Sequence, residues 1–366
     1  MFPGLAVAEE LRQRGLAVTL LISPKEVDQA AVRNVRDLRV ATLPAVGLSG
    51  KNLPGFAAGC WRSYRQCCAL FRAHPPAAVL AMGGFTSAPP VLAGRRFGAS
   101  TFLHESNAIP GRANRWLSWV VDRAFVGFEQ AGRRLHTRRV VATGTPVRPQ
   151  FQPRDAATCR QALGLDPARP TLLVMGGSQG ARGVNDLFLV ALPQLRERVP
   201  LLQFIHLAGA PAFASVSQRH AALRSGALLR AFADEMETLM GAASVAVTRA
   251  GASSLAELAA LRLPAVLVPY PVAADNHQWH NARAFEQTGA ALLLEQRSAT
   301  PELLTEKVIT LLDDAHGARK HQAALAQWDR PGAAAEIAAA IVASFDSEVT
   351  AQTQSASLRS ATPAHP

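Results

Sequence analysis

Short, almost wholly apolar runs alternate with helix-like segments along the chain, and this alternation constrains the fold more than any other feature. In the first half the runs are "AVTLLI", "LRVATLP", "AAVLAMGG", "STFLHES", "RAFVGF" and "RRVVATG". In the second half they are "TLLVMGG", "LLQFIHLAG", "ALLRAFA", "VAVTRAG", "PAVLVPYP" and "ALLLEQ". Strands that are apolar on both faces and separated by helices are typical of parallel sheets covered by helices on both sides. The sequence therefore predicts an α/β fold with doubly wound parallel sheets.

Two such series in a chain of 366 residues indicate two domains rather than one large sheet. The stretch "GTPVRPQFQPRD", from Gly144 to Asp155, is polar and rich in proline, and it separates the two series. We expect an N-terminal domain over residues 1–147 and a C-terminal domain over 148–331. A helix over 332–346 and a disordered tail over 347–366 are expected to follow, because the tail is polar and has no periodicity.

The net charge of +11 is concentrated in the first half of the chain. Residues 1–148 hold 20 Lys and Arg against 8 Asp and Glu, whereas the remainder holds 18 against 19. This asymmetry predicts an anionic partner for the first half. No nucleic-acid-binding motif is present and aromatic residues make up only 6%, so an anionic membrane surface explains the charge at least as well as nucleic acid.

One basic segment is also aromatic: "KNLPGFAAGCWRSYRQCCALFRAHP", from Lys51 to Pro75. It is either an interfacial helix whose aromatic and basic side chains enter lipid headgroups, or a helix packed on the sheet with its basic side chains in solvent. No apolar run reaches the roughly 20 residues that a membrane-spanning helix needs.

Metal-ligating and disulfide patterns are weak. His277 and His280 are three residues apart but have no further ligands nearby, so no metal site is predicted. The four cysteines lack CxxC spacing and are expected to be reduced packing residues of a cytosolic protein: Cys60, Cys67, Cys68 and Cys159.

The clearest local motif is "TLLVMGGSQGARGVND", in which a buried strand ends at glycines 176, 177 and 180 and a helix is expected to begin near Asn185. Glycines there let backbone N–H groups approach an anion at a helix N-terminus. The alternative is simply a tight strand-to-helix turn. The motif lacks the GxGxxG spacing of a dinucleotide site and the GK[ST] of a P-loop.

A second turn of this kind lies in "VAVTRAGASSLAELAALRLPAVLVPYP". Its small residues, hydroxyls and amides at a helix start suit a diphosphate, and Glu257 can accept hydrogen bonds from two ribose hydroxyls. Alternatively, Glu257 only stabilises the helix dipole. The segment "ADNHQWHNA" adds polar groups, Gln278 among them, beyond the end of the next strand, where ligands of open sheets lie.

In the first half, "FLHESNAIPGRANRWL" places His104, Glu105 and Asn107 beyond a strand end. This cluster of acid, base and amide fits a site for carbohydrate hydroxyls, or it is a structural histidine with its partners. The glycines of "AMGGFTSAPP" also follow a strand. We expect both segments to face one cleft beyond the strand ends.

These segments, in this order, resemble the MurG family, which is part of glycosyltransferase family 28. They are "FPGLAVAEEL", "AMGGFTSAPP", "LHESNAIPGRANRWL", "GTPVR", "MGGSQGARGVN", "AFADEM", "TRAGASSLAELAALRLPAVLVPYP" and "DNHQWHNA", and they span about Phe2 to Phe345. The resemblance implies a GT-B fold, in which two Rossmann-like domains face each other across a cleft.

The resemblance also implies an inverting, metal-independent hexosyltransferase without a cofactor. Its reaction would move GlcNAc from UDP-GlcNAc to the 4-hydroxyl of lipid-linked MurNAc-pentapeptide (lipid I), giving lipid II for peptidoglycan synthesis, and so serve cell shape and division. The expected location is peripheral, on the cytoplasmic face of the bacterial plasma membrane.

Site residues follow from the resemblance position by position. Ala233 would place its backbone by the uracil, Glu257 would hold the ribose, and Gln278 would contact the GlcNAc. Ala233 stands where the family usually has a larger apolar residue. Glycines 83 and 84 would lie on the acceptor side. The full set of expected substrate-binding residues is Asn107, Arg148, Ser178, Ala233, Gly251, Ala252, Ser253, Ser254, Leu255, Ala256, Glu257 and Gln278.

The chain departs from the family pattern at its start. In the family a first strand and a GGTGGH loop, whose His is a candidate base, precede "FPGLAVA"; here Met1 stands just ahead of that segment. We therefore expect an internal start or a truncated copy, unpaired neighbours of the absent central strand, and weak or no catalysis. His104 and Glu105 are the remaining acid–base candidates. The alternatives are a catalytically impaired nucleotide-sugar-binding protein and another GT-B glycolipid glycosyltransferase.

Overall fold

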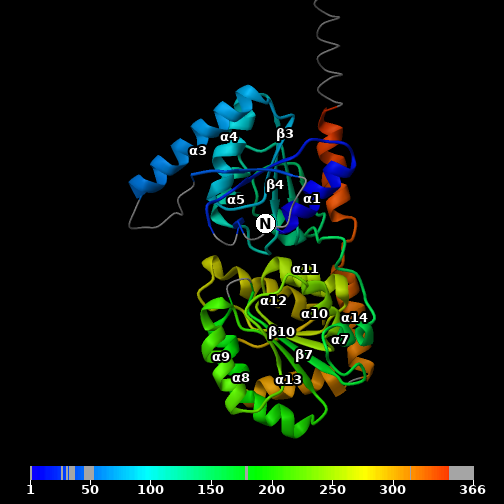
Figure 1. The fold of residues 1–366 in the computed structure, drawn as a ribbon. Coiled ribbons are helices and arrows are strands. Elements are labelled where there is room, and N and C mark those ends of the chain that lie inside the picture. Colours follow the sequence, from blue (N-terminus) through cyan, green and yellow to red (C-terminus); the bar gives the residue numbers. More distant parts are fainter. Residues whose placement is uncertain are drawn as a thin grey trace, which may run out of the picture.

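The computed structural model describes residues 2–25, 28–29, 32, 38–44, 53–177, 180–313 and 315–345. The disordered tail predicted over 347–366 lies outside these residues, as does Ser178. Within them the chain forms two α/β units, one above the other in Figure 1.

The C-terminal unit contains a six-stranded, wholly parallel sheet with the strand order β12-β11-β10-β7-β8-β9. This order is that of a doubly wound sheet, as the sequence predicts. Each strand falls inside one of the apolar runs of the second half: β7 (Thr171–Met175), β8 (Gln203–Leu207), β9 (Leu228–Arg230), β10 (Val245–Thr248), β11 (Ala265–Leu267) and β12 (Leu292–Leu293).

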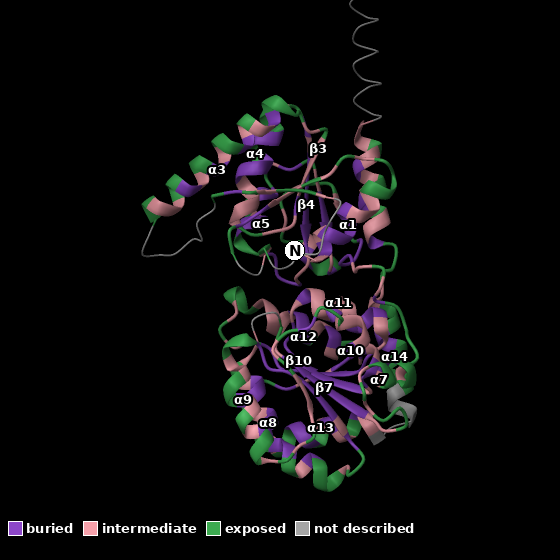
Figure 2. Cartoon of the chain, viewed as in Figure 1, coloured by how far each residue is buried: buried purple, intermediate pink, exposed green. Residues whose placement is uncertain are grey.

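Alternation along the central strand β7 explains why helices cover both faces of this sheet. Leu172 and Val174 belong to one buried cluster, whereas Leu173 and Met175 belong to the other. The first cluster also holds apolar side chains of α8 (Arg182–Arg198) and α13 (Pro301–Asp313). The second holds those of α10 (Met236–Ala242) and α11 (Ala252–Leu261). Figure 2 shows the resulting buried strands between partly exposed helices.

The remaining helices of this unit lie around these layers. Helix α7 packs against α10, α14 against α11, and α9 against α8. Their bounds, with that of α12, are α7 (Ala156–Ala162), α9 (Phe213–Ala222), α12 (His277–Gln287) and α14 (Ala315–Trp328).

The strands of the N-terminal unit form two separate parallel ladders. One joins β1 (Thr19–Ile22) to β2 (Arg39–Thr42), and the other has the order β3-β4-β5-β6. The second ladder consists of β3 (Ala78–Ala81), β4 (Ser100–Glu105), β5 (Arg123–Val126) and β6 (Val140–Val141). Among the described strands, β1 pairs only with β2, and β3 pairs only with β4, so the two ladders are not joined.

Helices cover both faces of the four-stranded ladder. On one face α4 (Ala88–Arg96) packs on β3 and β4, and α5 (Arg112–Leu117) contacts β4. On the other face α1 (Phe2–Gln13) and a helix over residues 333–345 bury Val7, Ile337 and Ile341 against Phe102 and Phe125. The chain therefore returns from the C-terminal unit to complete the N-terminal core, as the red segment beside α1 shows in Figure 1. The short helix α6 (Glu129–Gly132) follows β5.

The basic aromatic segment forms α3 (Leu53–Ala73), which packs against α4. Its buried positions Gly59, Ser63, Cys67 and Phe71 recur every four residues, and its basic side chains are exposed. Trp61 is 61% exposed. One stripe of α3 therefore packs on the protein while its basic side chains face solvent, and entry of the exposed side chains into lipid headgroups stays a prediction. No described helix, α3 included, combines the length and the apolar character needed to cross a bilayer.

Candidate functional site

Strand order brings the two candidate turns together. Strands β7 and β10 are direct neighbours, with Met175 in register with Thr248, so the segments that follow them leave the sheet side by side. In the order β12-β11-β10-β7-β8-β9, strands β8 and β9 follow β7 toward one edge of the sheet, whereas β11 and β12 follow β10 toward the other edge. Ligands of open parallel sheets bind at the carboxyl ends of the strands at such a point.

The turn after β10 ends in an uncapped helix N-terminus. Gly251 is the N-cap of α11, with φ −69° and ψ 135°, and no side chain caps the helix. The first N–H groups of a helix have no intrahelical acceptor, and the helix dipole places partial positive charge at that end. Ser253 and Ser254 are partly exposed in this first turn, whereas Leu255 is buried. The turn therefore offers amide and hydroxyl donors to an anion.

The end of the same strand is anchored by Arg249. Its Nη1 donates to the carbonyl oxygens of Val268 (3.0 Å) and Pro269 (3.1 Å), just beyond β11. Its guanidinium also lies 5.4 Å from the centre of the Tyr270 ring. The Arg249 side chain therefore links the end of β10 to the end of β11.

The turn after β7 requires glycine. A Cβ on Gly176 would stand 2.2 Å from the amide nitrogen of Ala181, and Gly180 has φ +73°. The turn closes tightly because Gly180 N donates to the Gly177 carbonyl at 2.9 Å. Helix α8 then begins at Arg182, one turn earlier than the predicted start near Asn185. Ser178, the predicted donor-site residue of this turn, is outside the described residues.

Glu257 lies one turn into α11 in an unusual environment. Burial raises the pKa of its carboxyl to about 7, and the Arg148 charge opposes this rise while Glu237 adds to it. Arg148 stacks between Phe2 and Phe151, 4.8 and 5.2 Å from the two ring centres. Its buried Nε has no hydrogen-bond partner within the structure. The structure thus places the Arg148 charge near enough to Glu257 to affect the pKa of its carboxyl, while the buried Arg148 Nε has no partner.

Two further predicted residues lie beyond strand ends of the same sheet. Gln278 is in the first turn of α12, and its Oε1 accepts from Tyr270 N at 3.0 Å. Ala233 is buried in the loop between β9 and α10, where it joins the core beneath that loop. These contacts place the two residues but do not test their expected contacts with the donor, so both roles stay predictions.

His104 and Glu105 are both buried at the end of β4, and their polar atoms are occupied. His104 Nε2 is 3.0 Å from the Gly144 carbonyl, so it carries the proton, and Nδ1 accepts from Ser106 Oγ at 3.1 Å. Burial lowers the pKa of His104 to about 4, so the ring is neutral.

The Glu105 carboxylate organises the loop that follows it. Oε1 accepts from Asn107 N (2.8 Å) and Asn107 Nδ2 (3.0 Å). Oε2 accepts from Gly111 N and Asn114 Nδ2, both at 2.9 Å. With four donors satisfied, Glu105 shapes the loop that carries Asn107.

Asn281 joins the two units, a role that the sequence analysis did not predict. This fully buried side chain donates from Nδ2 to Asn107 Oδ1 (3.1 Å) and to the Ala250 carbonyl (3.0 Å). Its Oδ1 accepts from Ala108 N at 2.8 Å. One amide therefore ties the loop after β4 to the turn between β10 and α11. Its sequence signal is only a polar residue in "DNHQWHNA".

Aromatic packing reinforces this junction. Phe128, just beyond β5, lies 6.2 Å from Phe285 and 5.2 Å from Trp328, and the latter two stack at 4.4 Å. Beside it a cavity of 430 Å³ is lined by α1, by residues 147–153 and by residues 329–331 and 334–335. Arg148 lines this cavity as well, so it lies where the two units meet.

Comparison with known proteins identifies the family. The glycosyltransferase family 28 N-terminal domain matches residues 1–126, and the family 28 C-terminal domain matches residues 171–337. An N-acetylglucosamine transferase of Chlorobium luteolum is 35% identical over 356 residues, covering 93% of this chain and 95% of the relative. A second, from Anaeromyxobacter dehalogenans strain 2CP-1, is 34% identical over 342 residues, covering 92% and 88%. This chain belongs to glycosyltransferase family 28.

Both relatives carry the name UDP-N-acetylglucosamine–N-acetylmuramyl-(pentapeptide) pyrophosphoryl-undecaprenol N-acetylglucosamine transferase. Among solved structures, Acinetobacter baumannii MurG superposes with a TM-score of 0.70 at 25% identity, covering 93% of this chain and 95% of that one. The chain is therefore MurG-like, and the expected GT-B fold of two Rossmann-like units is confirmed.

Replacing Asn281 with leucine is expected to destabilise the junction of this family 28 chain strongly. Asn107 Oδ1, the Ala250 carbonyl and Ala108 N would lose their buried partner, and each unsatisfied group costs about 1–3 kcal/mol. Chemical denaturation should therefore show a free energy of unfolding lower by at least about 2 kcal/mol.

The matched control is Arg115→Ala, which removes the exposed ion pair with Asp275 (2.9 Å) between the same two units. Exposed pairs contribute about 1 kcal/mol or less. Equal stability of the two variants would contradict the role given to Asn281.

Proposed function

We propose that this chain transfers GlcNAc from UDP-GlcNAc to the 4-hydroxyl of lipid-linked MurNAc-pentapeptide, converting lipid I to lipid II. The observation that carries this proposal is the pairing of β7 with β10, which sets the glycine turn beside the uncapped N-terminus of α11. The names and identities of the family 28 relatives support the choice of donor and acceptor.

In the proposed mechanism the donor's diphosphate lies against the first turn of α11, residues 251–256. The acceptor oxygen attacks the anomeric carbon from the face opposite the diphosphate. A bond from that oxygen to the anomeric carbon forms as the bond to the phosphate oxygen breaks, so the configuration inverts, and the proton of the acceptor hydroxyl is released to solvent. Negative charge develops on the departing UDP, and the amides and helix dipole of α11 stabilise it.

Glu257 is proposed to hold the ribose. An ionised carboxylate can accept hydrogen bonds from two neighbouring hydroxyls, and such charge-assisted bonds are stronger than neutral ones. Gln278 keeps its Nε2 for the sugar while its Oε1 is bonded to Tyr270 N. His104 and Glu105, predicted as acid–base groups, are instead proposed to position the loop of Asn107, because their polar atoms are occupied.

Location at the cytoplasmic face of the plasma membrane is also proposed. Helix α3 exposes Trp61 beside Arg62 and Arg65, a combination that suits the boundary of an anionic leaflet. Trp116 and Trp119, which the sequence analysis did not single out, are exposed in and after α5 of the same unit.

Turnover tests the proposed function directly. Purified chain, radiolabelled UDP-GlcNAc and lipid I should give labelled lipid II, a result that would refute the weak or absent catalysis expected from the start of the sequence. Glu257→Gln is expected to lower kcat/KM for the donor by about ten- to a hundredfold, because a charged acceptor for the ribose is lost. Glu197→Gln, an exposed acid at the end of α8, should leave kcat/KM unchanged. Donor binding without any transfer would reject the transferase and favour the nucleotide-sugar-binding alternative.

Donor binding should depend on pH through Glu257. The ribose requires the ionised carboxylate, whose pKa is raised to about 7 in the free protein. Affinity for UDP-GlcNAc should therefore be full above that pH and fall by up to about tenfold per pH unit below it. Calorimetry across this range measures the dependence. Glu257→Gln should bind UDP-GlcNAc weakly, with an affinity that does not change with pH. If the affinity of that variant kept the same pH dependence, a group other than Glu257 would be the one that titrates.

Membrane binding is tested by sedimentation with vesicles. Anionic vesicles should retain the chain and zwitterionic vesicles should not. Each basic side chain near an anionic surface contributes about 1 kcal/mol, so Arg62→Ser/Arg65→Ser should weaken partitioning by roughly 30-fold. Arg198→Ser/Arg297→Ser removes the same charge from exposed positions of the other unit and should have little effect. Equal losses in both double variants would argue against α3.

A further inference from the structure

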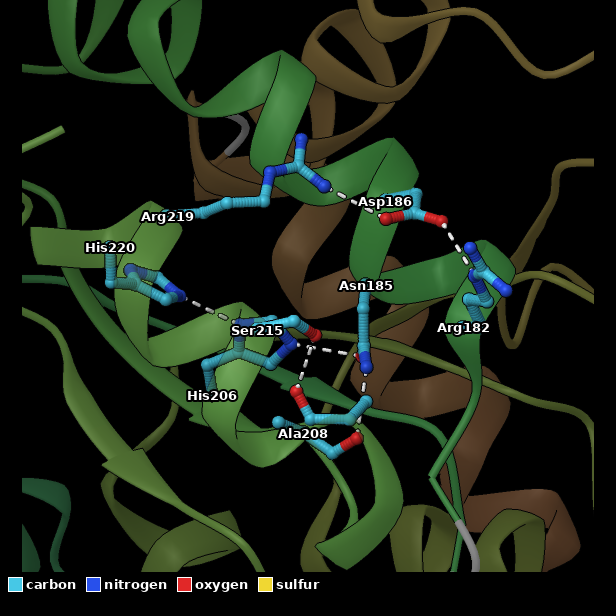
Figure 3. A network of polar contacts seen from close by, with 9 residues as sticks. Arg182, Asn185, Asp186, His206, Ala208, Ser215, Arg219 and His220 are labelled. Atoms are coloured by element: carbon cyan, nitrogen blue, oxygen red, sulfur yellow. Dashed lines mark hydrogen bonds and ion pairs between the residues drawn. The ribbon is translucent and has the colours of Figure 1, made fainter. Parts of the chain in front are cut away.

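A buried chain of polar side chains lies beneath the glycine turn that follows β7 (Figure 3). It joins Asn185 in the first turn of α8, His206 on β8 and His220 on α9, all of which are buried. The edge of the Phe188 ring packs against His206, 5.1 Å between ring centres, and helps to exclude water. An isolated polar group here would be costly, so the completeness of the chain matters.

Hydrogen-bond geometry fixes the direction of every proton in this chain. Asn185 Nδ2 donates to the Ala208 carbonyl at 2.9 Å, so Asn185 Oδ1 is the acceptor that faces His206 Nε2 at 3.0 Å. His206 Nε2 must therefore carry a proton, which leaves Nδ1 of the neutral ring as an acceptor.

The same logic extends to the next ring. His220 Nε2 donates to His206 Nδ1 at 2.8 Å, and His220 Nδ1 accepts from Ser225 Oγ at 2.7 Å. Ser225 Oγ in turn accepts from Ala227 N at 3.3 Å. All donors point one way, from residue 227 to the Ala208 carbonyl.

Both rings are held neutral. Burial lowers the pKa of His206 to about 3, with His220 opposing a charge as well. Burial also lowers the pKa of His220, and the neighbouring Arg219 charge adds to the shift. A second proton on His206 would place two donors face to face, so near neutral pH only one arrangement satisfies every group.

The chain ends at the glycine turn itself. The Ala208 carbonyl that accepts from Asn185 also abuts Gly180, where a Cβ would stand 2.6 Å from that oxygen. Asn185 N donates to the Ala181 carbonyl at 2.9 Å. Asn185 and Ala208 therefore contact the last residues of the turn, Asn185 at Ala181 and Ala208 at Gly180.

We propose that the His206–His220 pair, with Ser225 behind it, is a positioning element for the donor-binding turn. It fixes the orientation of the Asn185 amide and, through Ala208, the backbone path at Gly180. This inference rests on the proposed function, since it assumes that the turn binds the nucleotide sugar. Neither histidine touches the donor; each acts through Asn185.

A graded set of variants tests this role. His220→Leu leaves His206 Nδ1 without its donor and the Ser225 hydroxyl proton without its acceptor, and it should weaken UDP-GlcNAc binding about tenfold. Ser225→Ala removes only the last link and should weaken binding about threefold. His220→Gln, whose amide can still donate to His206, should bind within about threefold of the parent chain. In each case KM for the donor should rise while KM for the acceptor stays constant.

Asp186→Asn is the matched control. Asp186 is the exposed neighbour of Asn185 on α8, and it pairs with Arg219 (2.8 Å) and Arg182 (3.7 Å) across the surface (Figure 3). Its substitution should leave donor affinity unchanged. If Asp186→Asn lost as much donor affinity as His220→Leu, any disturbance of α8 would weaken binding in the same way, and the proposal would be overturned.

Nitrogen-15 NMR of the unsubstituted chain provides a readout that needs neither a variant nor a ligand. Both histidines should be neutral, with the proton on Nε2. A proton on Nδ1 of His206, or a charged ring at neutral pH, overturns the proposal even if His220→Leu fails to fold. Donor binding that is unchanged in Ser225→Ala and His220→Leu overturns it while leaving the proposed function intact. Failure of the parent chain to bind UDP-GlcNAc rejects both.

Discussion

The buried amide of Asn281 is the contact on which the arrangement of this protein most depends. It is the point where a loop of the N-terminal unit meets the turn that opens α11, through hydrogen bonds to Asn107, Ala108 and Ala250. Glu105 sets the shape of the first partner loop, and Arg249 ties the strand end of the second. A side chain without exposed surface has no water to replace a lost partner, so these bonds fix how the N-terminal unit, the proposed acceptor side, faces the C-terminal unit, the proposed donor side.

The proposed donor site of the C-terminal unit depends on the strand order of its sheet. Adjacent β7 and β10 bring two turns to one edge, and each turn supplies what a nucleotide diphosphate needs: close backbone approach from one and a helix N-terminus from the other. Donors that belong to the backbone are preorganised, so little reorganisation accompanies charge development on a leaving phosphate. The buried chain from Ser225 to Ala208 extends this principle one layer deeper, because it holds the turn without touching the ligand.

The apolar runs predicted the strands well because a strand buried on both faces leaves a continuous local signal. The expected α8 start was three residues late, since Gly183 is a weak helix former; the fold favours glycine there, because a Cβ would stand 2.6 Å from Gln296 Oε1. Asn281 escaped prediction because its partner Asn107 is 174 residues away and no periodicity marks the pair. The cluster of His104 and Glu105 stands out in the sequence, but only burial and hydrogen bonding reveal that its polar atoms are occupied. His206 lies in an apolar run that also contains Gln203, and its partner His220 lies on another element, so the sequence gives no sign of the pair.

The central claim is that the turns after β7 and β10 bind a uridine diphosphate sugar. A crystal structure of this chain with UDP-GlcNAc tests it most directly. The account predicts the diphosphate against the amides of residues 251–256, with the ribose hydroxyls on the Glu257 carboxylate. Density for the nucleotide elsewhere, for instance in the cavity beside Arg148, or a diphosphate that leaves the N-terminus of α11 uncontacted, would contradict it.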